Sequence, residues 1–208
     1  MSNKTGNNLS DNYLVERVLA GDTRAFGAII KNTEGLVAQI VYKMVDNAED
    51  RKDIAQDVYL KAFRHLSGFQ FKSKLSTWIG QIAYNSCLNH LEKKKPVLPG
   101  GMMEENGPGN ESLDSIDGKP FYAAGYTSDT DIEAIISGNE RRAILTSAIE
   151  ALSPIYKTLI TLYHREEMSY EEIGLITGMP EGTLKSYLFR ARKALKDCLL
   201  LTYKKEEL

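Results

Sequence analysis

Residues 169–195 read SYEEIGLITGMPEGTLKSYLFRARKAL, and this stretch predicts two short helices joined by a tight turn. Ser169 can cap the first helix, and Glu172 stands three residues later, the spacing of a capping box. Ile173 and Ile176 mark the side that we expect to be buried. Gly178 is expected to end this helix, because glycine readily takes the left-handed conformation found just after a helix C-terminus.

The second helix of the pair combines an apolar stripe with an excess of positive charge. Its stripe is expected from Leu184, Leu188 and Leu195. Its cations are Lys185, Arg190, Arg192, Lys193 and Lys196, and no acidic residue lies among them. This is the layout of a helix-turn-helix whose second helix enters the major groove, so the stretch predicts DNA binding.

The charge of the whole chain limits how that binding can work. The 208 residues suit one large domain or two small ones, the formal net charge is −2, and the pI is about 6.0. Proteins that hold DNA unaided usually carry a basic excess that neutralises phosphates. Either the DNA contact is small and local, or another macromolecule supplies much of the affinity.

The remaining sequence indicates an all-α protein with two small helical domains. We expect a first domain over residues 1–95, a linker over 96–130 and a second domain over 131–208, which ends in the helix-turn-helix. Ile54, Val58, Ala62 and Leu66 recur every four residues and predict one buried helix side. The expected helices of the first domain are 11–20, 25–31, 34–45, 48–66 and 75–94. In the second domain we expect a helix over 131–152, a helix that Ser153 caps with Pro154 in its first turn, and the helix-turn-helix pair.

The linker is rich in Gly, Pro, Ser and acidic residues and has a single base, Lys119. Such a composition buries too little apolar surface to offset its ordering entropy, so we expect a flexible acidic segment. It can serve as a simple tether or as a functional acidic strand, and the sequence favours neither.

Four blocks in order carry a resemblance to a known family. They are LVERVLAGDTRAF, AEDRKDIAQDVYLKAFRHLSGF, STWIGQIAYNSCLNHL and the helix-turn-helix stretch. Together they resemble the extracytoplasmic-function (ECF) sigma factors of bacterial RNA polymerase, across nearly all of both helical domains. The resemblance implies a non-catalytic specificity subunit that binds core RNA polymerase, recognises the −35 and −10 promoter elements and opens the −10 strands. It also implies an anti-sigma partner, and a linker that threads toward the polymerase active site.

The resemblance assigns roles to exposed-looking residues of the first domain. Asp53, Gln56 and Asp57 match positions that dock on the largest polymerase subunit. The −10 contacts would come from Lys61, Phe69, Phe71, Lys72, Asn85 and Asn89, which supply the aromatic surfaces and amide edges that separated bases need. Trp78 can belong to the core or contact DNA, and Lys93, Lys94 and Lys95 can replace a phosphate contact missing at Gln81 or simply be solvated.

In the second domain the resemblance places Lys185, Ser186, Tyr187, Phe189 and Arg190 at positions that meet the −35 element. Arginine can bind guanine through two hydrogen bonds, which makes Arg190 the expected base reader. Tyr187 stands where arginine is usual in the family, so the −35 preference can differ. Arg192, Lys193 and Lys196 are either phosphate contacts or solvated charges.

Other function classes fit the sequence less well. A stand-alone regulator with a helix-turn-helix would not need the DIAQDVYLKAF block. The three histidines lack a metal-binding spacing, and no phosphate-binding glycine loop or nucleophile elbow occurs. We therefore expect that the chain is not an enzyme and binds neither a metal nor a cofactor. Cys87 and Cys198 fit buried apolar positions, with a redox pair as the alternative. Because no signal-like leader and no transmembrane-length apolar run occurs, we expect a cytoplasmic protein without membrane insertion.

Overall fold

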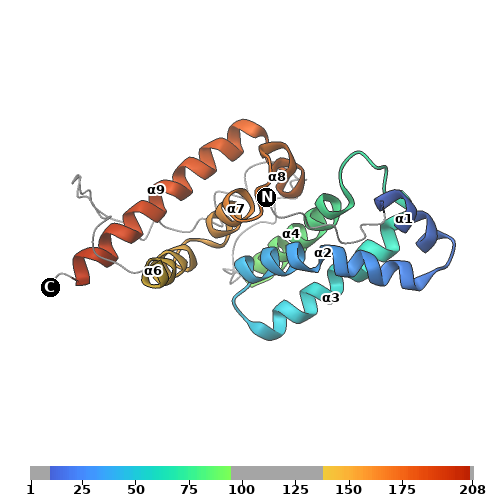
Figure 1. Ribbon diagram of the computed structural model, residues 1–208, viewed down its shortest axis with the longest axis horizontal. Helices are drawn as coiled ribbons and strands as arrows, with labels where there is room; N and C mark the ends of the chain where they lie inside the picture. Colours follow the sequence, from blue (N-terminus) through green and yellow to red (C-terminus); the bar gives the residue numbers. More distant parts are fainter. Residues whose placement is uncertain (1–9, 95–137, 207–208) are drawn as a thin grey trace, which may run out of the picture.

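The computed structural model describes residues 10–94 and 138–206, and all regular elements in these ranges are helical. Figure 1 shows them as two groups of helices lying side by side. The N-terminal region (residues 10–94) contains α1 (Asp11–Leu19), α2 (Thr23–Met44), α3 (Ala48–His65), a short 3-10 turn (Leu66–Gly68) and α4 (Leu75–Lys93). The C-terminal region (residues 138–206) contains α6 (Gly138–Glu150), α7 (Pro154–His164), α8 (Tyr170–Thr177) and α9 (Glu181–Glu206).

Side-chain caps start the first three helices. The backbone N–H of Tyr13 donates to Ser10, that of Arg24 donates to Asp22, and two N–H groups at the start of α3 donate to Asn47. Such caps satisfy donors that have no partner inside the helix. The predicted stripe of α3 is confirmed, since Ile54, Val58, Ala62 and Leu66 are all buried.

The prediction of two helices over 25–31 and 34–45 is wrong, because α2 runs without a break from Thr23 to Met44. Asn32 and Thr33 lie between the two expected pieces. Thr33 is only 3% exposed, and its hydroxyl donates to the carbonyl oxygen of Ile29 at 2.8 Å. The hydroxyl is thus satisfied inside the helix, so this polar pair does not interrupt it.

Local signals of the helix-turn-helix are confirmed. The N–H of Glu172 donates to Ser169 Oγ at 3.1 Å, and the N–H of Ser169 donates to Glu172 Oε2 at 3.0 Å, which completes the capping box. Gly178 ends α8 with φ +73°. Ile173, Ile176, Leu184 and Leu188 are fully buried, while Leu195 is half-buried. The helix expected at Pro154 is also present, although Ser153 precedes it without a side-chain capping bond.

The two regions share one hydrophobic core. A single cluster of buried side chains extends from Leu14 in α1 to Leu188 in α9. Helix α4 packs on α8, and α2 packs on α7 (Figure 1). Cys87 and Cys198 are both buried and outside any disulfide, as predicted, and burial raises the pKa of Cys87 to about 12.

The segment 96–130 lies outside the described residues, as does the start of the helix expected from Asp131. The linker and the domain boundaries therefore stay predictions.

Candidate promoter and polymerase interfaces

Four of the five residues predicted to meet the −35 element lie exposed on the first turns of α9. They are Lys185, Ser186, Phe189 and Arg190. Phe189 is 69% exposed, the largest value among the exposed apolar side chains of the described residues. The Lys185 ammonium contacts Glu181 at 2.6 Å, and this hydrogen bond raises the pKa of Lys185. An exposed aromatic ring between cations is an arrangement that suits a DNA groove.

Tyr187, the fifth residue, lies elsewhere. It is 5% exposed, and its ring centroid lies 6.0 Å from that of Tyr156 in α7. The guanidinium of Arg190 lies 5.7 Å from the same ring on its outer side. In this arrangement Tyr187 faces the protein interior. Its contact with DNA stays a prediction, and the side chain would have to move outward to make that contact.

A cluster of aromatic and cationic side chains lies beside α9 and was not predicted. Arg192 stacks on Tyr163 at 5.1 Å, and its Nε lies 3.4 Å from His164 Nε2. Tyr170 lies 5.1 Å from Tyr163 between ring centroids, and a hydrogen bond with Tyr163 lowers the pKa of Tyr170. Arg192 is therefore held in place rather than free in solvent, which favours its interpretation as a phosphate contact.

The loop predicted to hold a flipped −10 base carries a small aromatic cluster. Phe69 lies 4.7 Å from Phe71 and 5.3 Å from Trp78 between ring centroids. Phe69 is buried, whereas Phe71 is 45% exposed and has φ +56°. A non-glycine residue with positive φ is uncommon, and the packing of Phe69 and Trp78 holds this loop conformation. Phe71 and Lys72 thus belong to the accessible part of the loop.

The predicted −10 residues of α3 and α4 fall into two groups. Asn85 and Asn89 are both exposed and one helical turn apart on α4, so they can reach a ligand together. Lys61 is half-buried and donates from Nζ to Ser86 Oγ at 3.0 Å, which ties α3 to α4.

The predicted polymerase-binding residues Asp53, Gln56 and Asp57 are all exposed on α3. Sequence reasoning missed the apolar continuation of this exposed surface, Leu60 and Phe63, which are 52% and 48% exposed. Positions 53, 56–57, 60 and 63 repeat at three- to four-residue intervals, so the helical period was the signal that could have found them. The rings of Phe63 and of Phe26 in α2 form a T-shaped pair with centroids 5.0 Å apart.

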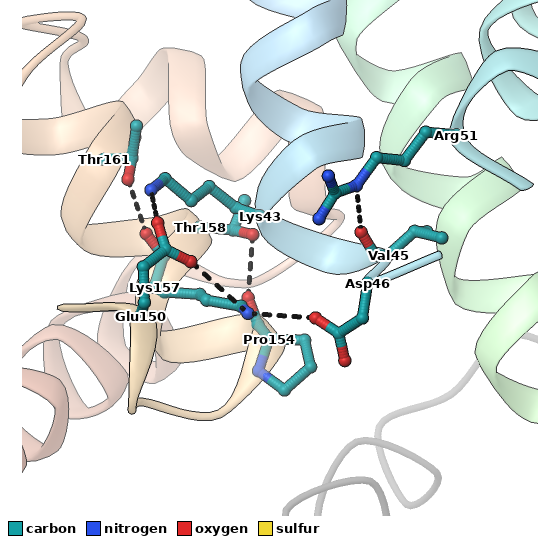
Figure 2. Close-up of polar contacts among 9 residues, drawn as sticks. All are labelled: Lys43, Val45, Asp46, Arg51, Glu150, Pro154, Lys157, Thr158 and Thr161. Carbon is teal, nitrogen blue, oxygen red and sulfur yellow. Dashed lines mark hydrogen bonds and ion pairs between the residues drawn. The ribbon is translucent and has the colours of Figure 1, made fainter. Parts of the chain in front are cut away.

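A second group missed from the sequence is a polar cluster between the two regions. Figure 2 shows Lys43 at the end of α2 paired with Glu150 of α6, and Lys157 of α7 lying between Glu150 and Asp46. Lys157 Nζ lies 3.5 Å from Asp46 and 3.8 Å from Glu150. The two lysine side chains are only 9% and 7% exposed. No local pattern could have shown this cluster, because residues about a hundred positions apart build it.

In the described parts of the chain, no group of three or more His, Cys, Asp or Glu side chains could hold a metal ion. Among the same residues, no helix has both the length and the apolar character needed to cross a bilayer.

Comparison with known proteins gives a consistent result. The family model described as sigma-70 region 2 matches residues 29–97, and the one described as sigma-70, region 4 matches residues 142–195. The ECF RNA polymerase sigma-E factor of Escherichia coli K12 is 32% identical over 190 residues, which cover 91% of this chain and 94% of the relative.

Two solved structures share the fold. CnrH in complex with the cytosolic domain of CnrY has a TM-score of 0.58 at 18% identity and covers 91% of this chain and 96% of its own. The sigma factor RpoE of Bartonella quintana, in complex with the anti-sigma factor NepR, has a TM-score of 0.54 at 19% identity. It covers 84% of this chain and 96% of its own.

Proposed function

This chain belongs to the ECF sigma factors of the sigma-70 family, and on that premise we propose how its surfaces divide the work of transcription initiation. As a member of the family it is a non-catalytic subunit of RNA polymerase that directs promoter-specific transcription. The proposal concerns which residues do so, and it assigns core binding and −10 opening to residues 1–95 and −35 reading to residues 131–208.

The observation that carries the −35 assignment is the exposed set Lys185, Ser186, Phe189 and Arg190 on the second helix of the helix-turn-helix. Arg190 reads a base edge, and Lys185 contacts a phosphate. Each good bidentate contact to a base is worth about 1–3 kcal/mol of discrimination, whereas a phosphate contact carries no sequence information directly.

Transcription by reconstituted holoenzyme from a panel of mutated −35 elements tests this division. Arg190→Ala should relax selectivity at one −35 position, and Lys185→Ala should weaken every template and lower the salt dependence. Lys31→Ala, an exposed lysine of α2 with no assigned DNA contact, is the control. Equal loss on every template for Arg190→Ala would reject its role as base reader.

For the −10 element we propose that four exposed residues contact the separated strand: Phe71, Lys72, Asn85 and Asn89. The buried Phe69 packs against Phe71 and holds the loop in place. Opening a duplex costs about a few kcal/mol per base, which stacking on an aromatic ring partly returns. The exposure of Phe71 and of the two asparagines supports this assignment. Permanganate reactivity of −10 thymines, compared between the wild type and Asn85→Ala, measures strand opening directly.

For core polymerase we propose the exposed surface of α3 that runs from Asp53, Gln56 and Asp57 to Leu60. Charged and amide groups would fix the orientation of docking, and the apolar end would add buried area. Gln56→Ala combined with Asp57→Ala should lower retention on immobilised core enzyme while the helix content stays unchanged. Glu16→Ala, an exposed carboxylate of α1, serves as the control, and full retention of the double variant would contradict the assignment.

Two further assignments complete the proposal. An anti-sigma protein is a partner of this chain, and a sigma factor of similar fold, RpoE of Bartonella quintana, is described in complex with the anti-sigma factor NepR. The chain acts in the cytoplasm, where its polymerase and promoter lie.

A further inference from the structure

The first turn of α4 takes its cap from a distant part of the chain. Lys74, the residue before the helix, makes no capping bond with its own side chain. Instead, the backbone N–H of Leu75 donates to Asp11 Oδ2 of α1 at 2.9 Å, across 64 residues of sequence. The first N–H groups of a helix have no partner inside it, so this carboxylate satisfies a donor that α4 itself cannot. Its negative charge also suits the positive end of the helix dipole.

Helix α1 is held firmly enough to present this carboxylate in one place. Three of its side chains are buried in the core: Leu14, Val15 and Val18. Its last turn is tied to the start of α2, because Arg17 pairs with Asp22, the residue that caps α2. Asp11 itself is half-buried at the first turn of α1. The capping oxygen therefore belongs to a fixed part of the N-terminal region.

The capped turn carries the side chain that supports the −10 loop, residues 69–74. Trp78 closes this turn, since its N–H donates to the carbonyl oxygen of Lys74 at 3.2 Å. The Trp78 ring centroid lies 5.3 Å from that of Phe69, which in turn lies 4.7 Å from that of Phe71. Phe71 is the exposed member with positive φ, a conformation that persists only where its surroundings hold it. The carboxylate of α1 is thus connected, through one helical turn and three aromatic rings, to the ring proposed to contact DNA.

Helix α1 also packs against the segment that precedes the −10 loop. The 3-10 turn Leu66–Gly68 contacts α1, and Leu66 is only 1% exposed. Both ends of the loop therefore rest on the same helix, the first through packing and the second through the hydrogen bond of Asp11. A loop whose two ends are fixed loses less conformational entropy when it binds a ligand.

We propose that Asp11 is a positioning residue for −10 recognition, which holds the −10 loop and the first turn of α4 in the conformation that receives an unpaired base. Asp11 touches no DNA itself and acts through the N–H of Leu75. This inference rests on the proposed function, which assigns Phe71 and Lys72 to the −10 element. The role requires an acceptor oxygen at the correct reach, so asparagine should replace Asp11, while alanine should not.

The single tryptophan of the chain reports on this connection directly. Trp78 is half-buried, so its quenching by acrylamide in the free chain measures how well the first turn of α4 stays closed. Asp11→Ala should raise the quenching constant, and Asp11→Asn should leave it at the wild-type value. Asn12→Ala, at the exposed neighbour in the same turn of α1, is the matched control. Unchanged quenching in Asp11→Ala would overturn the connection between α1 and the loop. Asp11→Glu keeps the charge but displaces the acceptor, so it repeats the test if the alanine variant loses helix content.

Selectivity at the −10 element is the readout that a purely structural role would not change. Reconstituted holoenzyme transcribes a promoter with its natural −10 element and variants with single-base substitutions in that element, and the ratio of the transcripts is measured. A loss of overall stability lowers transcription from every template alike and leaves the ratio unchanged. In Asp11→Ala the ratio should fall by about fivefold, the factor that corresponds to the typical loss of one N-cap. Asp11→Asn should keep the wild-type ratio.

The outcomes separate this inference from the proposed function. A wild-type ratio in Asp11→Ala, or a lowered ratio in Asp11→Asn, would overturn the positioning role. An equal fall in Asn12→Ala would also overturn it, because the effect would then belong to α1 as a whole. Failure of the wild type to transcribe with core polymerase, or to distinguish the natural −10 element from the substituted ones, would instead overturn the proposed function. The Trp78 measurement, made on the free chain, does not depend on that result.

Discussion

The pair formed by Lys43 and Glu150 allows the contact between the two regions to be measured as a free energy. Lys43 belongs to α2 and Glu150 to α6, so their coupling exists only while the regions are docked. We predict that Lys43→Met and Glu150→Gln, singly and together, give a non-zero interaction free energy in a double-mutant cycle.

The burial of the two side chains sets the expected magnitude. Removing one partner of a fully buried pair costs about 3–5 kcal/mol, and an exposed pair is worth at most about 1 kcal/mol. Lys43 is 9% exposed, but Glu150 is 34% exposed, so solvent screens part of the interaction. We therefore expect an interaction free energy of about 1–2 kcal/mol, reduced in about 1 M salt.

The assay is urea unfolding of the wild type, the two single variants and the double variant, monitored by circular dichroism. The free energy of unfolding of each protein is extrapolated to zero urea. The exposed pair Lys185 and Glu181 of α9 provides a control cycle within one helix, for which we expect a smaller interaction free energy than for Lys43 and Glu150 because solvent screens both charges. An interaction free energy below about 0.3 kcal/mol for Lys43 and Glu150 would show that the regions do not dock in solution.

Three further outcomes are expected. Ser169→Ala removes the acceptor of the capping box and should lower the free energy of unfolding by about 1 kcal/mol in urea titrations. The hydrogen bond from Lys74 lowers the pKa of Glu172. The ionised Glu172 therefore adds to the free energy of unfolding above its unfolded-state pKa, and this stabilisation is lost as the pH falls through its folded-state pKa. Below about pH 5, the unfolding temperature of the wild type should therefore fall more steeply with pH than that of Glu172→Gln. Parallel plots of unfolding temperature against pH for the two proteins would contradict this. Phe189→Ala should change the free energy of unfolding by less than about 0.5 kcal/mol, because the ring is exposed, yet should reduce runoff transcription from a −35-dependent promoter.

What could be predicted from sequence follows from how local each signal is. The helix-turn-helix was predictable because Ser169, Glu172 and Gly178 act within a few residues of one another. The break expected near Thr33 was wrong because a polar pair resembles a helix boundary until its hydroxyl is known to bond inside the helix.

The candidate site shows the same division between local and long-range effects. Asn85, Asn89 and Arg190, which the family resemblance selected, are all exposed, as a contact with DNA requires. Burial of Phe69 and Tyr187 could not be predicted, because the atoms that cover Tyr187 include those of distant helices. The contact of Gly80 with Ile176 joins residues almost a hundred positions apart and leaves no periodic trace in the sequence.

The last turn of α2 connects two surfaces that would otherwise act independently. The guanidinium of Arg51 in α3 stacks on Tyr42 at 4.1 Å. Figure 2 shows it donating to the carbonyl oxygen of Val45, while Lys43, next to Tyr42 in the chain, reaches across to α6. Arg51 stands two residues before Asp53, the first of the proposed polymerase contacts. A ligand that shifts the beginning of α3 would therefore also act on the turn of α2 whose Lys43 pairs with Glu150 of α6.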